Sequence, residues 1–192
     1  MRKKNFWNLL TCVLAVAMLS VGFASCGSDN DDDNASGGGS ASTGSSGTGV
    51  SLGGKTVSVS NGYYSYEGEW ILTFTNYDLY NMTAATLPSS LNYLSINIED
   101  TEQGSGVPVG EFTKFHVYIV NGATPQGSPG EQYEGSAGYS DGANPNARLT
   151  INKNGDVYTI TYTGLTVDDD NNFIENTSFS WTGKLREAKN LH

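Results

Sequence analysis

Apolar and polar residues alternate along most of the chain between Lys55 and Leu185. In residues 69–75, for example, Trp70, Leu72 and Phe74 occupy every second position. A period of two places alternate side chains on opposite faces of a β-strand, so one face is buried and the other faces water. The pattern predicts a strand here and in residues 93–98, 112–120, 148–152, 157–162 and 179–185.

One hairpin stands out between two of these segments. Asn154-Gly155 separates residues 148–152 from residues 157–162. Asn and Gly both tolerate positive φ, as a two-residue type I′ loop requires. The sequence therefore predicts a tight antiparallel hairpin in which Asn152 lies opposite Val157.

The other connections are longer, and no segment has a convincing helical stripe. Residues 101–110, 121–132 and 140–146 are rich in Gly, Pro, Ser and Asn, which predicts loops. Residues 77–87 allow a helical turn or two before Pro88 stops them. We expect an all-β domain over residues 55–192, an antiparallel β-sandwich of about seven to nine strands. A lipocalin-like β-barrel is the alternative.

The N-terminus has the features of an export signal. Arg2-Lys3-Lys4 precedes a mostly apolar segment at 9–21, which is too short to span a bilayer and indicates a signal peptide at 1–25. Phe23-Ala24-Ser25-Cys26 resembles the lipobox of bacterial lipoproteins. This resemblance implies that Cys26 is lipidated and anchors the protein to a membrane. The alternative is an ordinary signal peptide with a chance cysteine.

An acidic stretch and a flexible tether follow. Residues 27–34 carry four aspartates and resemble the export signal of Bacteroidota-type surface lipoproteins. The resemblance implies a lipid-anchored protein of the outer membrane, exposed at the cell surface; a merely solvated charge run is the alternative. Gly and Ser dominate residues 27–54, so 26–54 is predicted to be a tether with a reach of about 30 Å.

The C-terminal part adds a second resemblance. Residues 147–185 contain a strand, Asn154-Gly155, a Tyr-x-Ile-x-Tyr strand at 158–162, an acidic loop at 168–172 and a final strand ending in Gly183-Lys184-Leu185. This order resembles the closing module of small Bacteroidota surface lipoproteins. It supports β architecture and surface location, and implies no reaction.

Composition excludes several functions. The chain carries 20 acidic and 10 basic residues, and Arg2, Lys3 and Lys4 lie in the signal. Such a surface repels nucleic acid. Cys12 and Cys26 leave no cysteine for a disulfide, a thiol nucleophile or zinc in the mature domain.

Catalysis is not expected. His116 and His192 are the only histidines, and His116 lies within a predicted strand, where a solvated sheet histidine is favoured over a triad member. Glu67 and Glu69 would share one strand face about 7 Å apart. A carboxylate-dependent glycan hydrolase using this pair is kept as an alternative.

Two groups of residues are candidate binding sites. Asp168, Asp170 and Asn172 have the spacing that opens a calcium loop, but the rest of the motif is missing. No cofactor is therefore expected, and calcium at these residues is the alternative. Tyrosines are dense in residues 61–80, and exposed rings beside polar groups would suit sugar stacking. A buried core face is favoured for most of this cluster. The tyrosines predicted to be exposed, and therefore the candidate ligand-binding residues, are Tyr63, Tyr77 and Tyr80.

These features predict a surface recognition or accessory module without catalytic activity. Its ligand would be an extracellular glycan, a protein in a surface complex, or a small nutrient. A structural or adhesive subunit of a surface assembly is the second possibility, and the hydrolase is the third.

Overall fold

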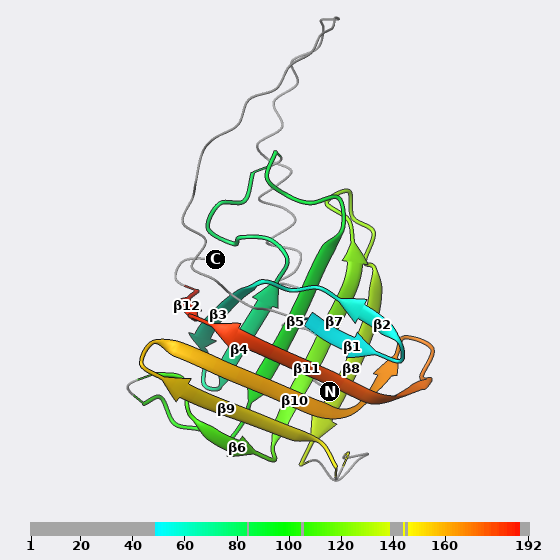
Figure 1. The fold of residues 1–192 in the computed structure, drawn as a ribbon. Helices are drawn as coiled ribbons and strands as arrows, with labels where there is room; N and C mark the ends of the chain where they lie inside the picture. The colour runs from blue at the N-terminus through cyan, green and yellow to red at the C-terminus, as the bar shows by residue number, and fades with distance from the viewer. Residues whose placement is uncertain (1–48, 84, 105, 139–143, 145, 189–192) are drawn as a thin grey trace, which may run out of the picture.

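The computed structural model describes residues 49–83, 85–104, 106–138, 144 and 146–188, and within them the fold is all-β without a helix (Figure 1). This confirms the predicted class. The twelve strands are β1 (Gly49–Leu52), β2 (Lys55–Val57), β3 (Asn61–Tyr66), β4 (Trp70–Thr75), β5 (Leu91–Ile98), β6 (Gly110–Phe112), β7 (Phe115–Ala123), β8 (Glu131–Ala137), β9 (Arg148–Asn154), β10 (Val157–Asp168), β11 (Phe173–Gly183) and β12 (Arg186–Glu187).

The strands form one curled sheet. Its order is β12-β3-β4-β5-β7-β8-β10-β11-β1-β2, with β9 paired to β10 and β6 paired to β9. Every pairing is antiparallel except that of β12 with β3. In Figure 1, β9, β10, β11 and β1 cross in front of β4, β5, β7 and β8. The sheet therefore has two halves that face each other, as in a sandwich. The front half contains β9, β10, β11 and β1, and the other half contains β4, β5, β7 and β8. Both halves belong to one hydrogen-bonded sheet.

A bend in β10 joins the halves. The first part of β10 pairs with β9 and β11, and its last residues, Val167 and Asp168, pair with β8. An irregularity between Gly164 and Thr166 interrupts the register there. Such bulges bend a strand. The hydroxyls of Thr166 and Thr177, both fully buried, bond to each other at 2.8 Å beside the bend.

The core fills the space between the halves. Phe74 of β4 contacts Phe179 and Trp181 of β11, with ring centroids 4.8 and 5.2 Å apart. Phe115 of β7 meets Tyr162 of β10 edge to face at 5.8 Å. Each such pair adds about 0.5–1.5 kcal/mol beyond simple burial. The alternation noted in the sequence thus points its apolar residues inward, as predicted.

The hairpin at residues 154–155 is confirmed, but its loop lies one residue further along. Asn154 pairs with Val157, so Gly155 and Asp156 form the two-residue loop, and Asn152 pairs with Thr159. Gly155 has a φ of 58°, while neither Asn154 nor Asp156 has positive φ. Glycine in the first loop position suits a type II′ turn rather than the predicted type I′. Compared with the predicted pairing, each residue of β9 pairs with a residue two positions further along β10. Because this shift is an even number of residues, every side chain stays on the sheet face that was predicted for it.

Three further expectations need correction. Gly49–Leu52, placed in the tether, forms β1 between β11 and β2. Twelve strands exceed the expected number, because short strands such as β2, β6 and β12 carry too few residues to show a period. Glu67 and Glu69 lie in the turn between β3 and β4 rather than along one strand, and Glu67 N–H donates to Glu69 O.

Candidate functional site

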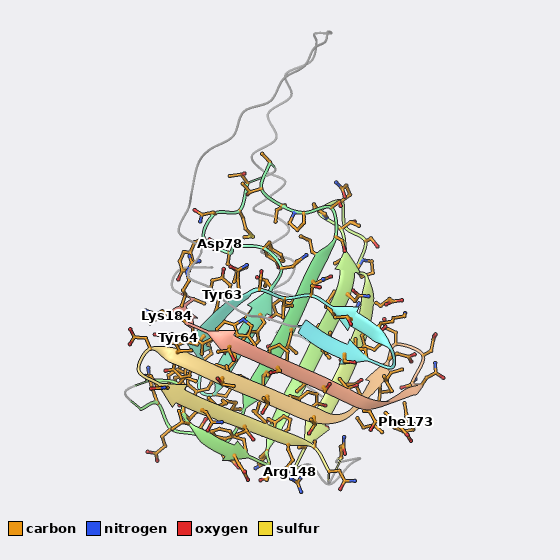
Figure 2. All side chains as sticks on the ribbon, in the orientation of Figure 1. Tyr63, Tyr64, Asp78, Arg148, Phe173 and Lys184 are labelled. Carbon is orange, nitrogen blue, oxygen red and sulfur yellow. The ribbon has the colours of Figure 1, made fainter. Side chains whose placement is uncertain are left out.

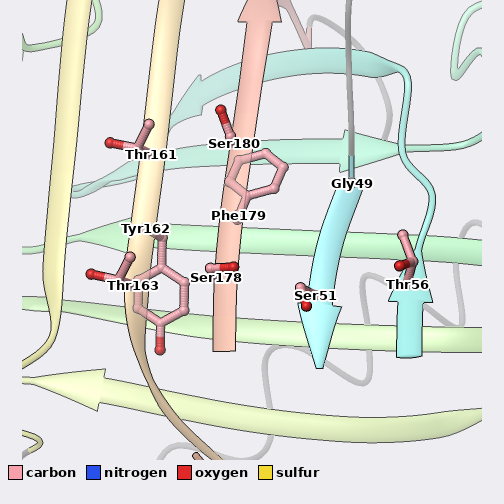
Figure 3. A pocket seen from close by; sticks show the side chains of 9 residues that line it. All are labelled: Gly49, Ser51, Thr56, Thr161, Tyr162, Thr163, Ser178, Phe179 and Ser180. Carbon is pink, nitrogen blue, oxygen red and sulfur yellow. The ribbon is translucent and has the colours of Figure 1, made fainter. Parts of the chain in front are cut away.

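A shallow groove of about 390 Å³ lies on the outer face of the front half of the sheet. We call it the hydroxyl groove. Its lining residues come from β1, β2, β10 and β11: Gly49, Ser51, Thr56, Thr161, Tyr162, Thr163, Ser178, Phe179 and Ser180. Figure 3 shows these residues on four neighbouring strands, with the strands of the other half passing behind.

Strand register arranges the hydroxyls in rows. One row crosses all four strands, because each residue pairs with the next: Thr163 of β10, Ser178 of β11, Ser51 of β1 and Thr56 of β2. A second row contains Thr161, Ser180 and Gly49. Neighbouring strands lie about 4.8 Å apart, and rows two residues apart lie about 7 Å apart. The groove is therefore floored by a regular array of small polar side chains.

The same alternation that builds the core produces this array. Tyr162 and Phe179 point inward and are at most 2 % exposed. Their neighbours on each strand, such as Thr163 and Ser178, must point outward. Burial raises the pKa of Tyr162, so no lining side chain is charged at neutral pH. The groove can donate and accept hydrogen bonds, but its lining offers no acid, base or activated nucleophile.

The predicted tyrosines lie elsewhere, and two of them, Tyr63 and Tyr80, bond to Asp78. Figure 2 labels Tyr63 and Asp78. Tyr63 is fully buried and Tyr77 is 7 % exposed, whereas Tyr80 is 43 % exposed. The prediction that Tyr63 and Tyr77 present exposed rings is wrong, because Tyr63 and Tyr77 pack with Leu79 in a small core of their own. Tyr64, Tyr66, Trp70 and Phe74 belong to the main core or pack against it, as the favoured interpretation held.

The Asp78 cluster comprises Tyr63, Asp78, Tyr80 and Arg186. Asp78 Oδ1 accepts hydrogen bonds from Tyr63 Oη at 3.0 Å, Arg186 Nη1 at 3.0 Å and the Tyr80 backbone N–H at 2.9 Å. The Arg186 guanidinium carbon lies 4.4 Å from the Tyr80 ring centroid and 5.4 Å from that of Tyr63. Tyr80 Oη donates to the Glu187 carbonyl. These contacts hold β12 against β3 and the 76–90 loop.

Electrostatics follow from this geometry. Burial opposes ionisation of Asp78, but hydrogen bonds from Tyr80 N–H, Arg186, Tyr63 and Asn81 outweigh it and lower its pKa to about 2. Burial raises the pKa of Tyr63 to about 12, and the neighbouring Asp78 carboxylate adds to this. The cluster is therefore a closed ion pair with bonded phenols, which stabilises the fold.

The acidic turn between β10 and β11 is also bonded within itself. Asp168 Oδ1 accepts from the backbone N–H groups of Asp170 and Asn172, and its Oδ2 accepts from Asn172 Nδ2 at 3.1 Å. The Asn172 side chain and these backbone bonds lower the pKa of Asp168. Within the described residues, no three His, Cys, Asp or Glu side chains are grouped to hold a metal ion.

Most surface cations lie beside carboxylates. Lys55 bonds Glu131 at 2.7 Å, Lys114 bonds Asp100, and Lys184 lies 3.4 Å from Asp156. His116 is exposed on β7, 3.7 Å from Glu99, so it faces away from the core as predicted. The lining of the hydroxyl groove itself carries no charged side chain.

Cys26, the acidic stretch and most of the predicted tether lie outside the described residues. In the part of the chain that the structure describes, no helix has the length and apolar character to cross a membrane. No family model matches the chain, and neither curated proteins nor solved structures give a significant match.

Sequence reasoning missed the hydroxyl groove and Asp78. A signal for the groove exists in the polar half of the alternation, at Thr159-x-Thr161-x-Thr163 and Ser178-x-Ser180-x-Thr182. Asp78 carries no such signal, since its partner Arg186 is 108 residues away.

Proposed function

We propose that this protein is a lipid-anchored recognition module of the outer membrane, exposed at the cell surface and without catalytic activity. The observation that carries the proposal is the hydroxyl groove: an open, uncharged hollow lined by outward hydroxyls and no ionisable group active at neutral pH. Such a surface suits reversible binding rather than bond cleavage.

The resemblances in residues 23–34 support the location. A lipid on Cys26 would hold the chain at the membrane, because each buried CH₂ contributes about 0.8 kcal/mol and two or more acyl chains anchor stably. The Gly- and Ser-rich stretch before Gly49 would then let the folded domain reach past the headgroups.

Fractionation tests the anchor. We expect the full chain to sediment with membranes and to be cleaved by protease added to intact cells, and Cys26→Ala to appear in the soluble fraction. Cys12→Ala, which removes the other cysteine and leaves residues 23–26 unchanged, is the matched control. If Cys26→Ala stays with the membranes as firmly as the unaltered chain, the lipid anchor is refuted.

Ligand binding by intact cells tests recognition. Cells that display the chain should retain a ligand from a mixed panel of glycans, proteins and small nutrients that cells lacking it do not retain. The ligand should be recovered chemically unchanged. Recovery of cleaved product would favour the hydrolase, while polymers of the chain without ligand retention would favour the structural subunit.

A further inference from the structure

The rows of hydroxyls continue past the groove on both β9 and β11. Thr161 pairs with Thr150, and Thr159 pairs with both Asn152 and Thr182. The Thr159 and Thr182 hydroxyls lie 3.3 Å apart. The outer face of the front half therefore presents hydroxyl and amide groups over several adjacent strands, with no aromatic ring among them.

We infer that this face binds an uncharged, extended polysaccharide, laid across the strands along the rows of hydroxyls. The inference rests on the proposed recognition function and names its ligand class. Hydroxyls both donate and accept hydrogen bonds, so the rows match a ligand that is itself covered in hydroxyls. The strand spacing of about 4.8 Å is close to the length of one sugar unit in an extended chain.

The charges of the protein favour an uncharged polysaccharide over an anionic one. The groove lining contains no lysine or arginine to pair with a uronate, sulfate or phosphate. The chain as a whole is strongly acidic, with 20 acidic against 10 basic residues, and like charges repel an anionic polymer. The first charged residues along the rows are Arg148, paired with Thr163, and Glu111, paired with Thr150. They bound the uncharged face on the β9 side.

The two aromatic residues of the groove lining, Tyr162 and Phe179, point inward and are buried, so the groove offers a ligand no ring for stacking. Each sugar–hydroxyl contact replaces a contact with water and contributes little alone. Affinity must therefore build up over many contacts along the chain. Binding should be weak for short oligosaccharides and increase with chain length, unlike binding by a pocket that holds one terminal sugar.

Affinity measurements on the full chain in detergent test this inference. The probes are soluble β-glucan, mannan and starch as neutral glycans, oligosaccharides of the one that binds, and polygalacturonate as an anionic glycan. The groove variant is Ser51→Lys with Thr163→Lys, since both positions are exposed and outward. The control is Ser136→Lys, an outward serine of β8 on the other half of the sheet.

We expect at least one neutral glycan to bind, with affinity increasing with chain length, and polygalacturonate not to bind. The groove variant should bind about tenfold more weakly or worse, because its lysines fill the groove. Ser136→Lys should stay within about twofold, and unchanged melting temperatures show that all variants fold.

Three results would overturn the inference. They are no binding to any neutral glycan, preference for polygalacturonate, or equal binding by the groove variant and the control. In the last case the chain still recognises a glycan and only the groove assignment fails. Failure of the proposed function itself would appear separately, as intact cells that retain no ligand of any class.

Discussion

The Asp78 cluster and the hydroxyl groove are both polar regions of the same molecule. In the first, the polar side chains bond to one another, whereas in the second they face solvent. In the Asp78 cluster the carboxylate, the arginine and the phenols bond to one another. In the hydroxyl groove, Thr163 and Ser51 extend from the sheet into solvent. The first region is therefore closed by its own contacts, while the second is open to a ligand.

This difference shows that residue type alone does not identify a binding surface. Asp, Arg and Tyr are the residues usually suspected of function, and here they attach the short strand β12 and the 76–90 loop to β3. Ser and Thr attract little attention, yet they supply most of the side chains that line the groove. The comparison can be tested by removing groups from each region.

The largest effect is expected for Asp78→Ala. The substitution leaves Tyr63 Oη and Arg186 without their acceptor beside a small buried core. Hydrogen bonds to a charged group are worth about 1.5–3 kcal/mol. Because the Asp78 side chain is 30 % exposed, we expect the free energy of unfolding to fall by about 2 kcal/mol, measured by urea denaturation.

Asp170→Ala provides the control for Asp78→Ala. Asp170 is an exposed aspartate of the β10–β11 turn, and its loss should change the free energy of unfolding by less than about 0.5 kcal/mol. Equal destabilisation by the two variants would contradict the structural role of the Asp78 cluster.

The second-largest effect is expected in acid, which should weaken the Asp78 cluster. Asp78 has a pKa of about 2 in the fold against an ordinary value of 3.8. A carboxyl whose pKa is lowered by folding stabilises the protein fully above its unfolded pKa, and this contribution is lost as the pH falls towards its folded pKa. We therefore expect unfolding free energy to decrease between about pH 4 and pH 2.

The Asp78→Asn variant isolates this contribution. Glu131 also has a pKa of about 2 because of its bond to Lys55, and Asp168 shifts in the same direction, so the whole protein loses stability in acid. The decrease should be about 1 kcal/mol larger in the unaltered chain than in Asp78→Asn. Parallel pH curves for the two proteins would show that Asp78 contributes no pH-dependent stability.

Much of the fold followed from local pattern. The alternation of Trp70, Leu72 and Phe74 predicted β4 and its buried face, because a strand has only two faces and one must be buried. The hairpin near Gly155 was also predictable from turn chemistry. Its exact loop was not, since both Asn154-Gly155 and Gly155-Asp156 can form a two-residue turn and the strand register decided between them.

The candidate site was less predictable for physical reasons. Tyr63 follows a glycine and precedes another tyrosine, so its neighbours do not reveal that the 76–90 loop covers it. The partners of Asp78 come from distant parts of the chain and meet only when β12 docks. For Thr163 and Ser178 the outward direction was implicit in the alternation, but their alignment across four strands depends on the insertion of β1 between β11 and β2.

The smallest effect on stability is expected in the hydroxyl groove. Thr163→Ala and Ser51→Ala remove exposed hydroxyls that face solvent, so each should change the free energy of unfolding by less than about 0.5 kcal/mol. Thr166→Ala is the matched contrast on the same strand as Thr163, because Thr166 is fully buried and its hydroxyl bonds Thr177. Its loss leaves Thr177 without this partner and should cost about 1–2 kcal/mol. If Thr163→Ala destabilised the protein as much as Thr166→Ala, the groove hydroxyls would be part of the structure rather than a surface kept open for a ligand.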